Sequence, residues 1–242
     1  MRFDYDVIVV GGGHAGCEAA IASARLGAKV LLVTLDMNRL AQMSCNPAIG
    51  GIAKGQIVRE IDALGGQMGI VADLTAIQFR MLNRSKGPAV WSPRVQSDRE
   101  KYIAQWRKII ESTENLELFQ DNVTGLLTDS DKHVTGVVTA LGFEFSAKTV
   151  VLTAGTFLNG LMHFGPVKLP GGRIAEQNSS GLTEQLVALG LHADRMKTGT
   201  PARIDGRTID FSLAERQDGD QLEWEKFSYL PEIRRRLRQR PC

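Results

Sequence analysis

A cysteine lies in a glycine loop at residues 44–51, whose sequence is SCNPAIGG. Cys45 comes just before a helix that we expect to begin near Ile52, and the N-terminus of a helix stabilises a thiolate. Lys54 and Arg59 add positive charge close by in the sequence. The thiolate is the reactive form of cysteine, so the pattern indicates a nucleophile or a proton donor. The alternative is the commoner fate of a single cysteine, which is burial among apolar side chains.

A second pattern, Gly11-x-Gly13-x-x-Gly16, follows a buried β-branched strand at 7–10 and opens an alanine-rich helix. The first glycine permits a tight turn, the second lets the backbone approach a pyrophosphate, and the third lets the helix pack on the strand. The helix N-terminus then offers N–H groups and a positive dipole end to the phosphates. The pattern predicts a dinucleotide loop made of Gly11, Gly12, Gly13, His14, Ala15 and Gly16. The alternative is a glycine-rich turn that serves only to pack the helix on the strand, and it does not explain the spacing of the three glycines.

The elements that position this loop form a βαβ unit, with a strand at 7–10, a helix at 17–26 and a strand at 30–34. In such units an acidic residue near the end of the second strand binds the ribose. Here Thr34 occupies that end and Asp36 lies two residues beyond. Either Asp36 substitutes, or the ribose is held in another way.

Further along the chain, hydrophobic periodicity predicts helices and short strands. The helices are expected at 52–64, 98–112 and 182–189, the strands at 116–119, 123–127, 134–140, 143–145 and 149–153, and a loop with a short helix at 67–97. The strands form a small meander that returns to the main sheet. The run from Thr149 to Thr156 resembles the second fingerprint of flavoproteins with two dinucleotide sites, which favours FAD over NAD; the alternative is an ordinary core strand and turn.

Composition narrows the class of protein. The 242 residues carry a net charge of +2, with 23% charged and 43% hydrophobic residues, which excludes a disordered chain and a generic polycation. Three cysteines make no disulfide scaffold, and Cys17, on the alanine-rich helix, fits the buried alternative. The apolar run at 7–10 is too short for a signal peptide, so we expect the cytoplasm and no membrane. His133 and His192 are expected at the surface, and we predict no metal site.

Four blocks of sequence carry a resemblance to a known family. GGGHAG at 11–16, SCNPAIGGIAKGQIVREIDALGG at 44–66, NRSKGPAVWSPRVQSDR at 83–99 and KTGTPARIDGRTIDFS at 197–212 resemble the GidA/MnmG family of FAD-dependent tRNA-modifying enzymes. The resemblance implies an α/β fold: a Rossmann-like FAD-binding domain of the two-dinucleotide flavoprotein type at 1–197, with a small β-meander. It also implies the beginning of an inserted α/β domain, cut short, at 198–242. The chain would then be the N-terminal part of a longer enzyme.

The resemblance also implies a reaction and its participants. The family installs a 5-carboxymethylaminomethyl group on the wobble uridine in the tRNA anticodon loop, using FAD, NADH, methylene-tetrahydrofolate and glycine. It works as a homodimer that forms a heterotetramer with a GTPase partner, MnmE. Two alternatives remain: another two-dinucleotide FAD oxidoreductase that acts on a small molecule, and a non-catalytic flavin- or tRNA-binding module.

Site residues carry over by position. Cys45 matches one of the family's two essential cysteines, and the second belongs beyond Cys242, so the chain alone would be inactive. Residues 11–16 match the FAD phosphate loop, and Val123 and Ser179 match two further FAD contacts. A thiolate suits the chemistry, because C5 of uracil becomes nucleophilic after an addition at C6. We assign no catalytic role to Cys242 and treat His14 as a bystander in its loop.

A basic stretch at 78–108 has a local charge of +6, from eight basic residues against Asp98 and Glu100, with Phe79 and Trp91 interleaved. The basic residues are Arg80, Arg84, Lys86, Arg94, Arg99, Lys101, Arg107 and Lys108. Cations with aromatic rings suit a phosphate backbone and unstacked bases, so tRNA or flavin contact is one interpretation of the part from Arg80 to Arg94. A solvated helix face over core aromatics is the other. The arginine run from Arg234 to Arg240 is interpreted as solvated charge.

Overall fold

The computed structural model describes residues 4–221, 226–233 and 239–241, and the chain divides into two compact units. Unit 1 combines Met1–Gln42 with Trp106–Met196, and unit 2 combines Met43–Gln105 with Lys197–Cys242. Each unit is therefore built from two separate stretches of the chain. The domain border predicted between residues 197 and 198 stays a prediction.

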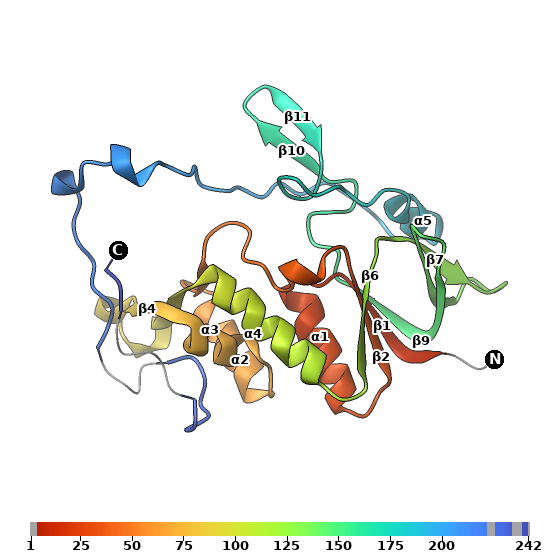
Figure 1. Cartoon of the computed structure of the whole chain (residues 1–242), viewed down its shortest axis with the longest axis horizontal. Helices are drawn as coiled ribbons and strands as arrows, with labels where there is room; N and C mark the ends of the chain where they lie inside the picture. The colour runs from red at the N-terminus through yellow and green to blue at the C-terminus, as the bar shows by residue number, and fades with distance from the viewer. Residues whose placement is uncertain (1–3, 222–225, 234–238, 242) are drawn as a thin grey trace. The chain divides into compact units, whose positions relative to one another are not determined.

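Unit 1 is organised around a six-stranded sheet with the order β6-β2-β1-β9-β8-β7 (Figure 1). Its strands are β1 (Tyr5–Val10), β2 (Val30–Thr34), β6 (Leu116–Gln120), β7 (Val123–Thr128), β8 (Val134–Thr139) and β9 (Glu144–Leu152). Strand β1 pairs in parallel with both β2 and β9, and β2 pairs in parallel with β6. Strands β7 and β8 add an antiparallel meander to β9. All five residues of β2 are buried, as expected for a parallel strand covered on both faces.

Helix α1 (His14–Arg25) packs against this sheet through a stripe of small and apolar side chains. Cys17, Ala20, Ile21 and Ala24 are buried, at the spacing of one helix face. The predicted start at residue 17 was wrong, because Gly13 is the N-cap and the end of the glycine loop already forms the first turn. At the other end Gly27 adopts φ +90°, which a glycine after a helix does at little cost.

Strand β9 replaces the two strands predicted at 143–145 and 149–153, and their separation was wrong. Its first half pairs with β8, where Gly136 faces Ser146, and its second half pairs with β1, where Val9 faces Val151. One long strand thus changes partners along its length. A change of partner leaves no turn signal in the sequence, and the polar residues between the two apolar runs imitate a loop between two strands.

Unit 2 contains a three-stranded antiparallel sheet with the order β3-β5-β4 and two helices. The elements are β3 (Ala48–Gly50), α2 (Gly55–Ala63), α3 (Met68–Thr75), β4 (Ala76–Leu82) and β5 (Ser92–Ser97). The prediction of a loop with a short helix at 67–97 was wrong for both strands. A register shift between Ala76 and Gln78 breaks the two-residue alternation of β4, and Pro93 inside β5 imitates a loop signal. Helix α2 also begins later than predicted, after a turn in which Ala53 has φ +59°.

Two buried carboxylates hold a distant segment in the core of unit 2. Asp73 is fully buried and accepts hydrogen bonds from the backbone N–H groups of Phe227 (2.9 Å) and Ser228 (2.8 Å). Asp62 accepts one from the N–H of Tyr229 (2.8 Å). The ring of Phe227 packs edge-to-face on Phe79 with centroids 6.3 Å apart. Buried backbone donors require partners, so these carboxylates fix residues 227–229 in place.

Helix α4 (Arg99–Ser112) confirms the helix predicted at 98–112, and its residues are shared between the two units. Asp98 caps it by accepting a hydrogen bond from the N–H of Lys101 (3.2 Å). Tyr102, Trp106 and Ile110 are fully buried, which confirms the core of the predicted apolar stripe.

The remaining elements of unit 1 are helix α5 (Leu182–Ala188) and a two-stranded hairpin of β10 (Leu161–Phe164) and β11 (Val167–Pro170) (Figure 1). Within the described part of the chain, no helix combines the length and the apolar character needed to cross a membrane. Residues 234–238 of the arginine run, and Cys242, lie outside the described residues.

Candidate functional site

The glycine loop of unit 1 joins the end of β1 to the start of α1, at the carboxyl edge of the parallel strands. Gly11 has φ +106°, and its N–H donates to the carbonyl of Val33 (2.8 Å). The hydroxyl of Thr153, just after β9, donates to the carbonyls of Val10 (2.9 Å) and Gly11 (3.0 Å). The turn is therefore held by the neighbouring strands on both sides, and the carboxyl edge is where ligands of such sheets bind.

The three glycines of the motif differ in the space around them. A Cβ on Gly11 would lie 2.6 Å from the carbonyl oxygen of Thr153, and a Cβ on Gly16 would lie 1.8 Å from the carbonyl oxygen of Gly11. A Cβ on Gly13 would meet nothing within 4 Å in the part of the chain that the structure describes. Gly11 and Gly16 are thus required by packing, whereas the backbone at Gly13 faces open space beside a helix N-terminus. A pyrophosphate fits this arrangement.

His14 is the first residue of α1, its side chain is partly buried, and its ring is neutral at physiological pH. Burial, together with the positive charge of Arg173, lowers its pKa from 6.5 to about 4. Cys17, one turn further on, donates a hydrogen bond from its thiol to the carbonyl of Gly12 (3.4 Å). Burial raises the pKa of Cys17 to about 12, against the opposing effect of the Ala41 backbone N–H. The expectation that Cys17 is buried is confirmed.

A polar cluster in unit 1 was missed by the sequence reasoning. Glu176 pairs with Arg39 and with the Nε of Arg173 (3.1 Å), and Arg173 also donates to the side-chain carbonyl of Gln42 (2.7 Å). Asp36, considered for the ribose, caps a short helical turn at Met37–Arg39 and pairs with the Nε of Arg39 (3.1 Å). These residues belong to two stretches of sequence, 36–42 and 173–176, so no spacing pattern identifies them.

Thr34, which stands where such units carry the acidic residue that binds the ribose, is buried at the end of β2. A Cβ added to Gly12 would lie 2.6 Å from the Thr34 hydroxyl oxygen, so this side chain abuts the glycine loop. The role of Asp36 at the ribose stays a prediction.

Val123 and Ser179, expected to touch FAD, are brought together although 56 residues separate them. The Ser179 hydroxyl donates to the carbonyl of Val123 (3.0 Å), and both residues are buried. Asp121, directly after β6, donates its N–H to the carbonyl of Thr34 (3.0 Å) at the end of β2. That contact places the start of the 121–123 connection at the same carboxyl edge as the glycine loop.

The cysteine loop lies in unit 2, and the thiol of Cys45 is exposed. Gly50 and Gly51 have φ +80° and +98°, a conformation that favours glycine. A Cβ on Gly50 would lie 2.3 Å from the carbonyl oxygen of Pro93, so the loop fits closely against β5. The Ser92 hydroxyl donates to the carbonyl of Gly51. The loop is rigidly supported at its glycine end, and the burial alternative does not describe Cys45.

Residues far along the chain also contact this loop. The Thr200 hydroxyl lies 3.8 Å from the Cys45 sulfur, and Arg203 donates to the carbonyls of Cys45 (2.5 Å) and Ser44 (3.5 Å). Arg59, expected near the thiol, instead donates to the carbonyl of Lys226 (3.0 Å). The sequence block at 197–212 carries part of the family resemblance, but nothing in the spacing of its residues indicates a contact with Cys45.

The basic stretch at 78–108 is not one continuous feature, since it crosses from unit 2 to unit 1 after Gln105. In unit 2, Arg84 pairs with Asp220 (3.3 Å) and lies 5.6 Å from the ring centroid of Trp91. In unit 1, Arg107 pairs with Glu111 (2.7 Å) along the helix. The two parts of the stretch therefore belong to different units. Contact with tRNA or flavin was predicted for Arg80 to Arg94, which lie in unit 2, and it stays a prediction.

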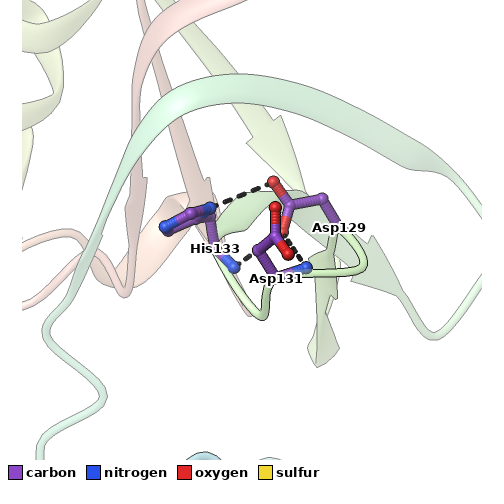
Figure 2. A group of neighbouring side chains, drawn as sticks. All are labelled: Asp129, Asp131 and His133. Carbon is purple, nitrogen blue, oxygen red and sulfur yellow. Dashed lines mark hydrogen bonds and ion pairs between the residues drawn. The ribbon is translucent and has the colours of Figure 1, made fainter.

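A group of potential metal ligands was not singled out from the sequence: Asp129, Asp131 and His133, in the turn between β7 and β8 (Figure 2). The Asp129 carboxylate accepts hydrogen bonds from the N–H groups of Asp131 and His133 (both 2.9 Å), and it faces the His133 ring (3.2 Å). All three are exposed. Closure of the hairpin turn explains why these side chains gather, and no cation is assigned to them.

The parallel sheet, the glycine turn at its carboxyl edge and the attached meander define a Rossmann-like fold of the type found in FAD-binding flavoproteins. Comparison with protein families identifies the group within that class. The model of the glucose inhibited division protein A family matches residues 6–242, so the chain belongs to this family.

Individual relatives agree with the family match. The chain is 66% identical to the tRNA uridine 5-carboxymethylaminomethyl modification enzyme of Porphyromonas gingivalis and 62% identical to that of Parabacteroides distasonis, over its whole length in each case. It spans only 38% of the length of each. A crystal structure of GidA from Aquifex aeolicus is 48% identical, with a TM-score of 0.92, and covers 98% of this chain and 40% of that one.

Proposed function

We propose that this chain carries the FAD site and one reactive cysteine of an enzyme that modifies the wobble uridine of tRNA at C5. The observation that carries the proposal is the glycine turn, which has open space at Gly13 and is held by the hydrogen bond from the Thr153 hydroxyl to the Gly11 carbonyl. The relatives of the chain bear the name of that modification. The group installed is 5-carboxymethylaminomethyl. NADH, methylene-tetrahydrofolate and glycine are the co-substrates of the proposal.

In the proposed site the backbone N–H groups at the start of α1 bind the FAD pyrophosphate, and the open side of Gly13 leaves room for it. Val123, directly after the connection that follows β6, and Ser179, whose hydroxyl bonds to the Val123 carbonyl, hold another part of the same cofactor. FAD, when bound, supplies the redox chemistry. His14, neutral through burial beside Arg173, adds no positive charge to the loop, so binding of the phosphates rests on backbone groups and the helix dipole.

Cys45 is the proposed group that acts on the uracil ring. As a nucleophile its sulfur forms a bond to C6, and the electron pair of the C5–C6 double bond moves to C5 and the O4 carbonyl, which makes C5 nucleophilic. After C5 has formed its new bond, loss of the C5 proton expels the thiolate and restores the double bond. As a proton donor the same thiol protonates the ring instead. Both roles require the exposed thiol that the structure shows.

The proposal includes the remaining participants. The protein as the cell makes it supplies the second cysteine, forms a homodimer and assembles with a GTPase, MnmE, into a heterotetramer in the cytoplasm. In this proposal residues 1–242 are inactive by themselves, because the reaction needs the second essential cysteine that the family resemblance implies. The target base is read in the anticodon loop, where single-stranded bases leave their stack readily.

The test is reconstitution of the protein as the cell makes it, with FAD, NADH, methylene-tetrahydrofolate, glycine, the GTPase partner and tRNA, followed by analysis of the tRNA nucleosides. We expect 5-carboxymethylaminomethyluridine with the wild type, none with Cys45→Ser, and nearly unchanged product with Cys242→Ser, a cysteine without an assigned catalytic role, as the matched control. Flavin content measured on each variant separates loss of chemistry from loss of cofactor. Unmodified uridine in the wild-type reaction would overturn the proposal.

A further inference from the structure

Residues 197–205 run as an extended segment past the cysteine loop within unit 2. Three hydrogen bonds from this segment converge on two adjacent residues, Ser44 and Cys45. Two come from the guanidinium of Arg203 to backbone carbonyls, and one comes from the hydroxyl of Thr200 to the sulfur. The two sides of this contact lie 155 residues apart in the sequence, so the contact is purely tertiary.

Each contact has a distinct physical effect on the thiol. One guanidinium nitrogen of Arg203, Nη2, donates to two successive carbonyls, which restricts rotation of the peptide that carries the Cys45 side chain. Pro201, between the two contacting residues, fixes the backbone φ of the segment. The Thr200 hydroxyl lies 3.8 Å from the sulfur, where it is a donor for a thiolate. A hydrogen bond to the charged form stabilises that form.

We propose that Thr200 and Arg203 are positioning residues for Cys45: Arg203 orients the peptide, and Thr200 stabilises and aims the thiolate through its hydroxyl. The inference rests on the role proposed above for Cys45. It extends that role by identifying groups from the 197–212 block that act on the reaction through the sulfur. Neither residue is proposed to touch the substrate.

The first test measures alkylation of Cys45 by iodoacetamide across a range of pH, in the protein as the cell makes it. Cleavage after Arg39 and Lys54 releases a peptide that contains Cys45 as its only cysteine, so mass spectrometry follows this thiol alone. In Thr200→Val we expect alkylation at neutral pH to slow by about three- to tenfold, the loss typical of one hydrogen bond. The midpoint of the pH profile should move upward, because the thiolate has lost a donor.

Two variants separate this effect from a structural one. Thr200→Ser keeps the hydroxyl and should restore both the rate and the midpoint. Thr208 lies in the same stretch of chain, but its hydroxyl donates to the carbonyl of Asp205. Thr208→Val should therefore leave the alkylation rate and the midpoint of the pH profile unchanged. Arg203→Met should slow alkylation as well, and Arg203→Lys should restore only part of the rate, because an ammonium group is more strongly hydrated than a guanidinium.

The second test measures tRNA modification by the same variants. We expect Thr200→Val to lower kcat with little change in the KM for tRNA, and Thr200→Ser to restore it. An unchanged pH profile in Thr200→Val would overturn the inference directly. If instead the profile shifts while Cys45→Ser still modifies tRNA, the contact with the thiol stands, and both the catalytic role of Cys45 and the positioning role fall.

Discussion

Substitution of Gly16 by alanine tests whether the glycine turn is built as the structure shows. The added Cβ would lie 1.8 Å from the carbonyl oxygen of Gly11 and 2.7 Å from the hydroxyl oxygen of Thr153. Real Cβ atoms essentially never come within 3.0 Å of another heavy atom, so the turn and the helix must separate by at least 1.2 Å. The Gly11 carbonyl and the Thr153 hydroxyl both lie at the carboxyl edge of the sheet. The carbonyl belongs to the backbone, so it cannot move aside by a change of side-chain rotamer.

The cost follows from the forced separation. Overpacking of a close contact destabilises a protein by about 1–3 kcal/mol, and for a chain of this size about 2 kcal/mol corresponds to a fall in Tm of roughly 4–8 °C. Opening of the turn also displaces the N–H groups at the start of α1, so FAD affinity should fall by at least about tenfold.

Gly13→Ala is the matched control. Its Cβ meets nothing within 4 Å among the described residues, and Gly13 has φ −75°, which alanine adopts without strain. The Tm of flavin-free protein should therefore stay within about 1 °C of the wild type. FAD affinity should still fall, because the methyl group occupies the open side where the pyrophosphate is proposed to bind.

The assays are circular dichroism melting of flavin-free protein and titration with FAD followed by flavin fluorescence. The pair of variants should separate, with Gly16→Ala losing stability and affinity and Gly13→Ala losing affinity alone. Equal Tm values for Gly16→Ala and the wild type would refute the packing argument. Full FAD affinity in Gly13→Ala would refute the placement of the pyrophosphate.

Two further predictions concern stability. Asp73→Ala leaves the buried N–H groups of Phe227 and Ser228 without their acceptor and should lower the free energy of unfolding by about 3 kcal/mol in urea titrations, whereas exposed Asp218→Ala should change it by less than about 0.5 kcal/mol; equal effects would contradict the role of Asp73. Because the pKa of His14 is about 4 in the folded state and 6.5 in the unfolded state, the unfolded chain binds the proton first as pH falls, and up to about 3 kcal/mol of stability should be lost between pH 6.5 and 4. His14→Gln should flatten this part of the pH dependence, and an unchanged slope would show that the ring is not buried in neutral form.

Prediction from sequence succeeded where neighbouring residues carry the signal. The glycine spacing after a β-branched run located the turn at residues 11–16, and the stripe of Tyr102, Trp106 and Ile110 located α4, since helix and turn patterns repeat over a few residues. It failed at β4 and β5, where a register shift and a proline hid the alternation. Hydrogen bonds to the neighbouring strand keep such irregular residues in the sheet. The partner of a strand cannot be read from that strand's own sequence.

The sequence by itself determined the class of fold, the position of the glycine turn and the loop that exposes Cys45. Each of these depends on local backbone preferences, which glycine, proline and β-branched residues express directly. Only the tertiary structure decided that Ser179 bonds to Val123 and that Thr200 and Arg203 reach the cysteine loop. These contacts join residues from distant parts of the chain. Their geometry depends on how the sheets bring those parts together, and no local pattern records it.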